Sequence, residues 1–221
     1  MQCDEIWQFV GAKAKNVSDE KKIAGWGDCW TWTAIDADTK LIISYEIGSR
    51  NAFNCYEFMK DLASRLTGRV QLSTDGLRWY HDAVDHAFGI DVDFAQINKI
   101  FGKVAADPSA AVRYSPAKIT GVTKEVVRGN PDPKHISTSY VERQNLTMRM
   151  SMRRFTRLTN GFSKKIDNHM AATALHFAYH NFCRVHQTLR VTPAMEARLT
   201  DHVWSIEELV GLLDRRNALA A

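Results

Sequence analysis

Three acidic residues at wide spacing carry the strongest chemical signal in this chain: Asp4 in QCDEIW, Asp75 in LSTDG and Glu142 in SYVERQN. Cleavage of a phosphodiester without a covalent protein intermediate commonly uses two metal ions roughly 3.5 to 4 Å apart, held by carboxylates from separate elements. Mg²⁺ prefers such oxygen ligands. Asp4 and Asp75 lie in or at the end of strand-like runs, and Glu142 lies on a helical stretch. The three acids therefore predict a metal-dependent nuclease or strand-transfer centre.

The elements that must position these acids follow from hydrophobic periodicity. Runs rich in β-branched and aromatic residues predict strands, and apolar residues recurring every three or four positions predict helices. The order of these elements predicts a mixed α/β domain with one central sheet. We expect strands at 3–10, 29–35, 41–47, 70–73 and 91–97, and helices at 51–66 and 79–87.

The second half of the chain is less regular. Residues 99–137 show no sustained period and contain several prolines, which predicts a long basic insertion or loop. The polar segment 11–27 is expected to be an exposed connection. Helical periodicity returns at 139–158 and 166–182, with a short helix near 206–213. We therefore expect a catalytic domain at 1–165 and C-terminal helices at 166–221 that pack on it.

Charge is distributed unevenly along the 221 residues. The net charge is +4, but residues 99–165 hold 14 Lys and Arg against 4 Asp and Glu. A polyanion such as nucleic acid is the natural partner of this block, with a solvated basic face as the alternative. No apolar run is long enough for a membrane span and no secretory signal is evident, so a cytoplasmic location is expected. The four scattered cysteines are expected to be reduced thiols.

The motifs also resemble a known family. CDEIWQFVGAK, STDGLRWY, YVERQNLTMRMSMRRF and the closing YHNFCRVHQTLRVTPAM look like those of bacterial DDE transposases of the insertion-sequence-one type. The resemblance implies a ribonuclease-H-like sheet of five strands in which the first and fourth strands are neighbours. It implies that Asp4, Asp75 and Glu142 are the catalytic, metal-binding triad for two Mg²⁺ ions, with Mn²⁺ as an expected substitute. The implied reaction is DNA cleavage and strand transfer.

The resemblance also implies partners. Related transposases recognise transposon ends through an N-terminal zinc-finger or helix-turn-helix region, whereas this sequence begins almost at Asp4. We therefore expect an upstream DNA-binding segment or polypeptide to supply that recognition. The expected partners are transposon-end and target DNA, bound by a homo-oligomer in the bacterial cytoplasm, in association with the nucleoid.

Basic side chains near Glu142 are candidates for guiding DNA toward the metals. Asn145, Arg149 and Arg153 follow Glu142 at intervals of three and four, so a continuous helix would place them on its face. A solvated helix surface is the alternative. Glu5 ranks behind Asp4 because a regular strand points it to the opposite face. The basic track would be extended by Arg154, Arg157, Lys164 and Lys165.

Other readings of the sequence are weaker. A zinc site would need ligands on one side of a helix, and the candidates are His176, His180, Cys183 and His186. Aromatic side chains could stack on unpaired bases, although core packing is the usual role of Trp26, Trp30, Trp32 and Trp79. Two other functions stay open: a structure-selective nuclease of the same fold, and a non-catalytic DNA-binding remnant that regulates transposition.

Overall fold

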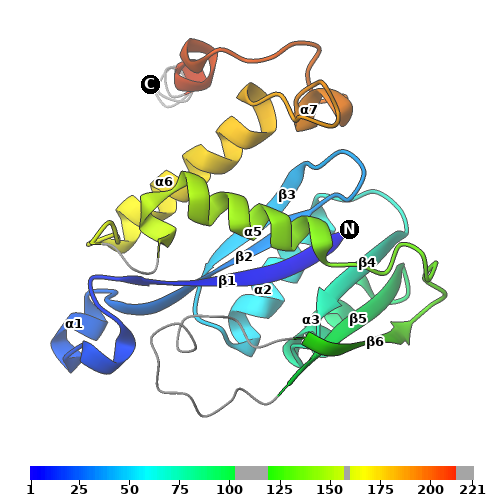
Figure 1. Ribbon diagram of the computed structural model, residues 1–221, viewed down its shortest axis with the longest axis horizontal. Helices are drawn as coiled ribbons and strands as arrows, with labels where there is room; N and C mark the ends of the chain where they lie inside the picture. Colours follow the sequence, from blue (N-terminus) through cyan, green and yellow to red (C-terminus); the bar gives the residue numbers. More distant parts are fainter. Residues whose placement is uncertain (103–118, 157–159, 213–221) are drawn as a thin grey trace.

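A computed structural model describes residues 1–102, 119–156 and 160–212. Within them the chain forms a mixed six-stranded sheet flanked by helices, with the strand order β3-β2-β1-β4-β5-β6 (Figure 1). The predicted mixed α/β domain with one central sheet is confirmed. The strands are β1 (Gln2–Val10), β2 (Gly27–Ile35), β3 (Ile42–Gly48), β4 (Val70–Asp75), β5 (Val92–Phe101) and β6 (Ile119–Arg128).

The centre of the sheet brings two distant segments together. β1 pairs antiparallel with β2 on one side and parallel with β4 on the other. In the parallel pair Cys3 lies opposite Thr74, so the residues that follow them, Asp4 and Asp75, are neighbours where β4 ends. β4 pairs in parallel with β5, and β5 pairs antiparallel with β6.

One face of the sheet is covered by α2 (Ala52–Ser64) and α3 (Trp79–Phe88). The core on this side is fully buried and includes Trp32, Phe58 and Tyr80. Asn51 caps α2 because its side chain accepts a hydrogen bond from the Asn54 backbone N–H at 2.9 Å. These helices follow the apolar periodicity of the sequence closely.

The other face is covered by α5 (Ser139–Ser151) and α6 (Ile166–Ala178). Ile6 of β1, Met148 of α5 and Phe177 of α6 belong to one buried cluster, so the last helices share a core with the sheet. Figure 1 shows α5 lying across β1 and β2. This position brings the helix that bears Glu142 over the strand that bears Asp4.

Several sequence predictions need correction. The sheet has six strands rather than five, because β6 occupies part of the segment expected to lack regular structure. β6 is an edge strand whose residues are mostly exposed, so no alternation of apolar and polar residues marks it. The predicted helix at 139–158 ends at Ser151, where Met152 adopts an extended conformation. Within the predicted insertion, β5 extends to Phe101, residues 129–137 form an irregular connection to α5, and residues 103–118 lie outside the described residues.

Shorter elements complete the chain. The connection between β1 and β2 contains a 3₁₀ turn (Ala14–Asn16) and α1 (Asp19–Ile23). α6 continues into a π-helical turn at Tyr179–Cys183, and α7 (Pro193–Glu196) and a helical stretch at 206–212 follow. None of the described helices combines the length and apolar character needed to cross a membrane.

Candidate active site

The predicted triad lines one cavity at the end of β4. The cavity has a volume of about 720 Å³, and Asp4, Asp75 and Glu142 are all on its wall. Asp4 and Asp75 come from adjacent parallel strands, and Glu142 comes from the first turn of α5. The fold therefore brings the three separated sequence motifs to one place.

The tightest acidic group in the described residues consists of Asp4, Glu5 and Asp75. Each offers a carboxylate oxygen, and these oxygens lie within 4.8 Å of one another, which allows them to hold a metal ion. Glu5 leaves the strand toward the α2 and α3 side, as strand alternation predicts. The sequence ranks Glu5 behind Asp4 for that reason, yet its carboxylate still reaches the same group.

Buried hydrogen bonds hold Glu5 in this position. The guanidinium of Arg50 donates from Nε to Glu5 Oε1 at 2.7 Å, and the Tyr80 hydroxyl donates to Glu5 Oε2 at 3.2 Å. Arg50 Nη2 also lies 3.9 Å from Asp75 Oδ2, and its guanidinium packs 5.0 Å from the ring centre of Trp30. Arg50 thus partly offsets the negative charge of the acidic group.

Burial raises the pKa values of all three acids, and neighbouring carboxylates add to the shifts of Asp4 and Glu5. Burial, followed by the charge of Asp75, raises the pKa of Asp4 to about 7. Burial and the charges of Asp75 and Asp4 raise the pKa of Glu5 to about 8, although Arg50 opposes this shift. The pKa of Asp75 is raised as well, mainly by burial. Removing carboxylates from water and placing them side by side disfavours their charged forms, and a bound cation would reverse that penalty.

Glu142 faces the same cavity but has its own partners. Thr138 and Lys99 both donate hydrogen bonds to its Oε1. The start of α5 is fixed to β1 because Gln2 Oε1 accepts hydrogen bonds from the backbone N–H groups of Tyr140, at 2.7 Å, and Val141, at 3.2 Å. Gln2 is thus a positioning residue that the sequence reading missed, since a lone buried Gln on a strand leaves no recognisable pattern.

The predicted DNA-guiding face of α5 is largely engaged within the protein. Asn145 is buried, and its Nδ2 donates to Asp4 Oδ2 at 2.8 Å, so it orients an acid rather than DNA. Arg149 donates to the backbone carbonyls of Phe155 and Trp7, at 3.0 and 3.4 Å. Asn145 and Arg149 do lie on the Glu142 side of α5, but α5 turns this face toward β1 and the chain that follows, so their role in guiding DNA stays a prediction.

The remaining basic candidates are scattered around the end of α5. Arg153 is exposed but lies in a 3₁₀ turn beyond the helix, so it does not continue the face of Glu142. Arg154 donates to the Ser163 hydroxyl at 3.0 Å, and Lys164 and Lys165 are exposed. Arg157 lies outside the described residues.

The zinc reading is not supported. Within the described residues, the acidic group of Asp4, Glu5 and Asp75 is the one set of three or more potential metal ligands close enough to share an ion. His176, His180, Cys183 and His186 do not form such a set. All four cysteines of the chain are free thiols, as predicted.

The tryptophans are divided between core and surface. Trp32 is fully buried, and Trp79 is partly buried against the same core. Trp26 packs against Gly11 and has the Lys21 ammonium 4.9 Å from its ring centre. Trp30 carries Arg50 on its ring, as described above.

The space around Gly76, on the wall of the acidic cavity, leaves no room for a side chain at this position. A Cβ atom at this position would lie 1.7 Å from Oδ1 of Asn98, which also lines the cavity. The glycine after Asp75 therefore leaves room for the Asn98 side chain just beyond the acid.

Comparison with known proteins gave no relative: no protein-family model and no curated protein matches the chain.

Proposed function

We propose that this chain is the catalytic part of a DDE transposase with a ribonuclease-H-like fold, which cleaves DNA and transfers strands during transposition of an insertion sequence. The observation that carries the proposal is the convergence of Asp4, Asp75 and Glu142 on one cavity from β1, β4 and α5. The order of the strands, with three antiparallel strands followed by parallel β4 and β5, is compatible with that fold.

The donor set fits a hard divalent cation. Asp4, Glu5 and Asp75 offer carboxylate oxygens within 4.8 Å of one another, and Glu142 lines the acidic cavity with Asp4 and Asp75. Carboxylate oxygens are the ligands that Mg²⁺ and Mn²⁺ prefer. Bound in pairs, such ions activate an attacking water or hydroxyl and stabilise the leaving oxygen. Asp4, Asp75 and Glu142 would hold the ions, and the cluster geometry makes Glu5 a further candidate ligand.

The surrounding residues prepare the acids for this role. Asn145 fixes the orientation of Asp4 by donating a hydrogen bond from its amide. Lys99 donates to the carboxylate of Glu142 and balances its charge. The positive charge of Arg50, which is hydrogen-bonded to Glu5, weakens the repulsion between Glu5 and the neighbouring carboxylates. Oriented, partly neutralised carboxylates reduce the reorganisation needed when ions bind.

The partners belong to the same proposal. Transposon-end and target DNA would approach the cavity, and exposed basic residues such as Arg153, Lys164 and Lys165 would contact the phosphate backbone. A homo-oligomer would hold two ends together, and end recognition would come from an upstream segment or polypeptide.

The test is a cleavage and strand-joining assay on labelled duplexes that carry candidate ends, with Mg²⁺ or Mn²⁺. We expect Asp75→Asn to abolish both steps and to leave DNA binding nearly intact. Asp91→Asn is the matched control, because Asp91 is exposed and outside the cavity. Cleavage without joined products would favour a structure-selective nuclease, and binding without either reaction would favour a regulatory remnant. Full activity of the Asp75→Asn variant would refute the proposed site.

A further inference from the structure

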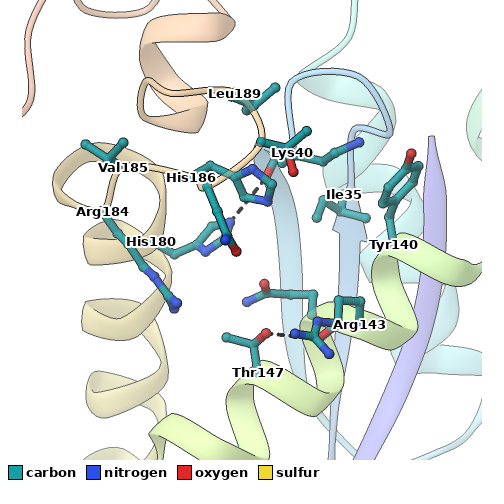
Figure 2. A pocket seen from close by; sticks show the side chains of 13 residues that line it. Ile35, Lys40, Tyr140, Arg143, Thr147, His180, Arg184, Val185, His186 and Leu189 are labelled. Atoms are coloured by element: carbon teal, nitrogen blue, oxygen red, sulfur yellow. Dashed lines mark hydrogen bonds between the residues drawn. The ribbon is translucent and has the colours of Figure 1, made fainter.

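A second cavity lies on the other side of α5 from the acids. It has a volume of about 480 Å³, and it shares no lining residue with the acidic cavity. Its walls come from three places in the chain: the turn between β2 and β3, the outward face of α5, and the segment that follows α6 (Figure 2). This last segment contains the closing motif YHNFCRVHQTLRVTPAM, for which the proposed catalysis provides no role.

The charge of this cavity is one-sided. Lys40, Arg143 and Arg184 line it, and no Asp or Glu does. Figure 2 shows Arg184 extending from the segment after α6 toward α5, which carries Arg143. Neither guanidinium has a hydrogen-bonding or ion-pair partner among the described residues, and both residues are exposed. Arginines without carboxylate partners on a shared wall are available to an anion from outside.

Buried polar atoms on the same wall also lack partners. Gln144 is 4% exposed, and its Nε2 has no hydrogen-bond partner. His180 is 7% exposed; its Nε2 contacts the carbonyl oxygen of Lys40 at 3.2 Å, and its Nδ1 has no partner. His186 Nδ1 is likewise unpaired. Unsatisfied buried polar groups are rare in native proteins; these atoms have almost no accessible surface, so a small side-chain rotation would bring them to a ligand or ordered solvent in the cavity.

The Lys40 ammonium on the cavity wall is held in place against the aromatic ring of Tyr140. The Lys40 ammonium lies 3.3 Å from the ring centre of Tyr140 and donates to the carbonyl oxygen of Ala37. Lys40 is therefore held at the cavity wall rather than extended into solvent, which lowers the entropy it would lose on binding an anion.

We propose that this cavity is a phosphate-binding pocket in which Arg143, Arg184, Lys40 and the Gln144 amide hold one phosphoryl group. A phosphoryl group offers several acceptor oxygens and matches arginine forks in shape and charge. The cavity is within the size range of small-ligand sites, so the group can belong to a free phosphate monoester or to a nucleic-acid strand. The pocket does not depend on the proposed catalytic role of the acids.

His180 offers a chemical distinction between a phosphate monoester and a phosphodiester of a DNA strand. Since the Lys40 carbonyl can only accept, His180 Nε2 carries the hydrogen, and Nδ1 of the neutral ring is an acceptor. A monoester that retains a proton can donate to Nδ1, whereas a phosphodiester in a DNA strand has no proton to donate.

The experiment compares the wild-type chain, R143Q/R184Q and the control K15Q/K60Q. The control removes the same charge from exposed lysines that do not line the pocket. Binding of inorganic phosphate and of thymidine 5′-monophosphate is measured by calorimetry in low-salt buffer. Binding of a short DNA duplex is measured by fluorescence anisotropy. Circular dichroism checks that each variant is folded, and the single variants R143Q and R184Q replace the double variant if it is not.

For a monoester pocket we expect R143Q/R184Q to bind phosphate and thymidine 5′-monophosphate at least about tenfold more weakly than the control, equal to about 1.4 kcal/mol. If the pocket instead binds a phosphate of a DNA strand, we expect R143Q/R184Q to bind the duplex about tenfold more weakly than the control. In that case none of the proteins should bind the two monophosphates measurably. Either pattern supports the pocket. Equal affinities of R143Q/R184Q and the control for all three probes would overturn it. Asp75→Asn should leave monophosphate binding unchanged, which separates this pocket from the acidic cavity.

Discussion

Asp75→Asn offers a test of the acidic cluster that needs no DNA. Asn has the same shape as Asp, and its side-chain oxygen can still accept the 3.1 Å hydrogen bond from the Leu77 backbone N–H that Asp75 accepts. The substitution therefore removes a charge and its weak ion pair with Arg50 but keeps this hydrogen bond. What changes is the repulsion between Asp75 and the carboxylates of Asp4 and Glu5.

The size of that repulsion follows from the geometry. Two unit charges 4.8 Å apart repel by about 3 kcal/mol at an effective dielectric constant of about 20, and by about 1 kcal/mol in water. Because the Asp75 side chain is 38% exposed and Arg50 lies 3.9 Å away, the solvent-screened value applies. We expect the metal-free variant to be more stable than the wild-type protein by about 1 kcal/mol at pH 9, where the acids are ionised.

Urea unfolding with EDTA and with excess Mg²⁺ measures this change. Mg²⁺ should stabilise the wild-type protein by about 2.7 kcal/mol at a concentration of about one hundred times its Kd. It should stabilise Asp75→Asn far less, while Asp91→Asn should behave like wild-type protein. A destabilised metal-free variant, or an equal gain from Mg²⁺ in all three proteins, would refute the reasoning.

Three further predictions concern pH, the end of α5 and the core. The pKa values of Asp4 and Glu5 are raised to about 7 and about 8, so between about pH 4.5 and pH 8 the folded protein holds protons that the unfolded chain releases. The metal-free free energy of unfolding should therefore fall as the pH rises from about 4.5 to about 8 and level off above that, and Mg²⁺ should weaken this dependence, as urea titrations at each pH would show. Arg149→Ala should lower the free energy of unfolding by about 1 to 3 kcal/mol in urea unfolding, because it removes hydrogen bonds to backbone carbonyls. Arg153→Ala should leave the free energy of unfolding unchanged within about 0.5 kcal/mol and should flatten the salt dependence of DNA binding. Met148→Ala, under α5, should cost about 2 to 5 kcal/mol in thermal or urea unfolding, and a smaller loss would show that α5 is not anchored there.

The sequence predicts the sheet well where one face of a strand is buried. β1 to β5 lie close to their expected ranges because they are rich in β-branched and aromatic residues, and helices α2 and α3 do so because their apolar residues recur every three or four positions. β6 escaped prediction because it is an exposed edge strand stabilised by pairing with β5, and pairing partners leave no mark in a single strand's pattern.

The candidate site was predictable in its acids and less so in its surroundings. Asp4, Asp75 and Glu142 stood out through their motif contexts. Strand alternation correctly placed Glu5 on the other face of β1, but it could not show that a long carboxylate reaches back to the group of Asp4 and Asp75. The role of Arg149 depended on where α5 ends, and that end is set by tertiary packing of Met152 and Phe155 rather than by a glycine or proline.

The central claim is that the acids bind a pair of divalent ions at the end of β4. Its most direct test is a crystal of this chain grown with Mn²⁺ and measured for anomalous scattering. Two peaks roughly 3.5 to 4 Å apart, contacted by Asp4 and Asp75 with Glu142 completing the site, are the predicted result. Fully occupied Mn²⁺ peaks elsewhere, with the acidic cavity free of anomalous density, would contradict it.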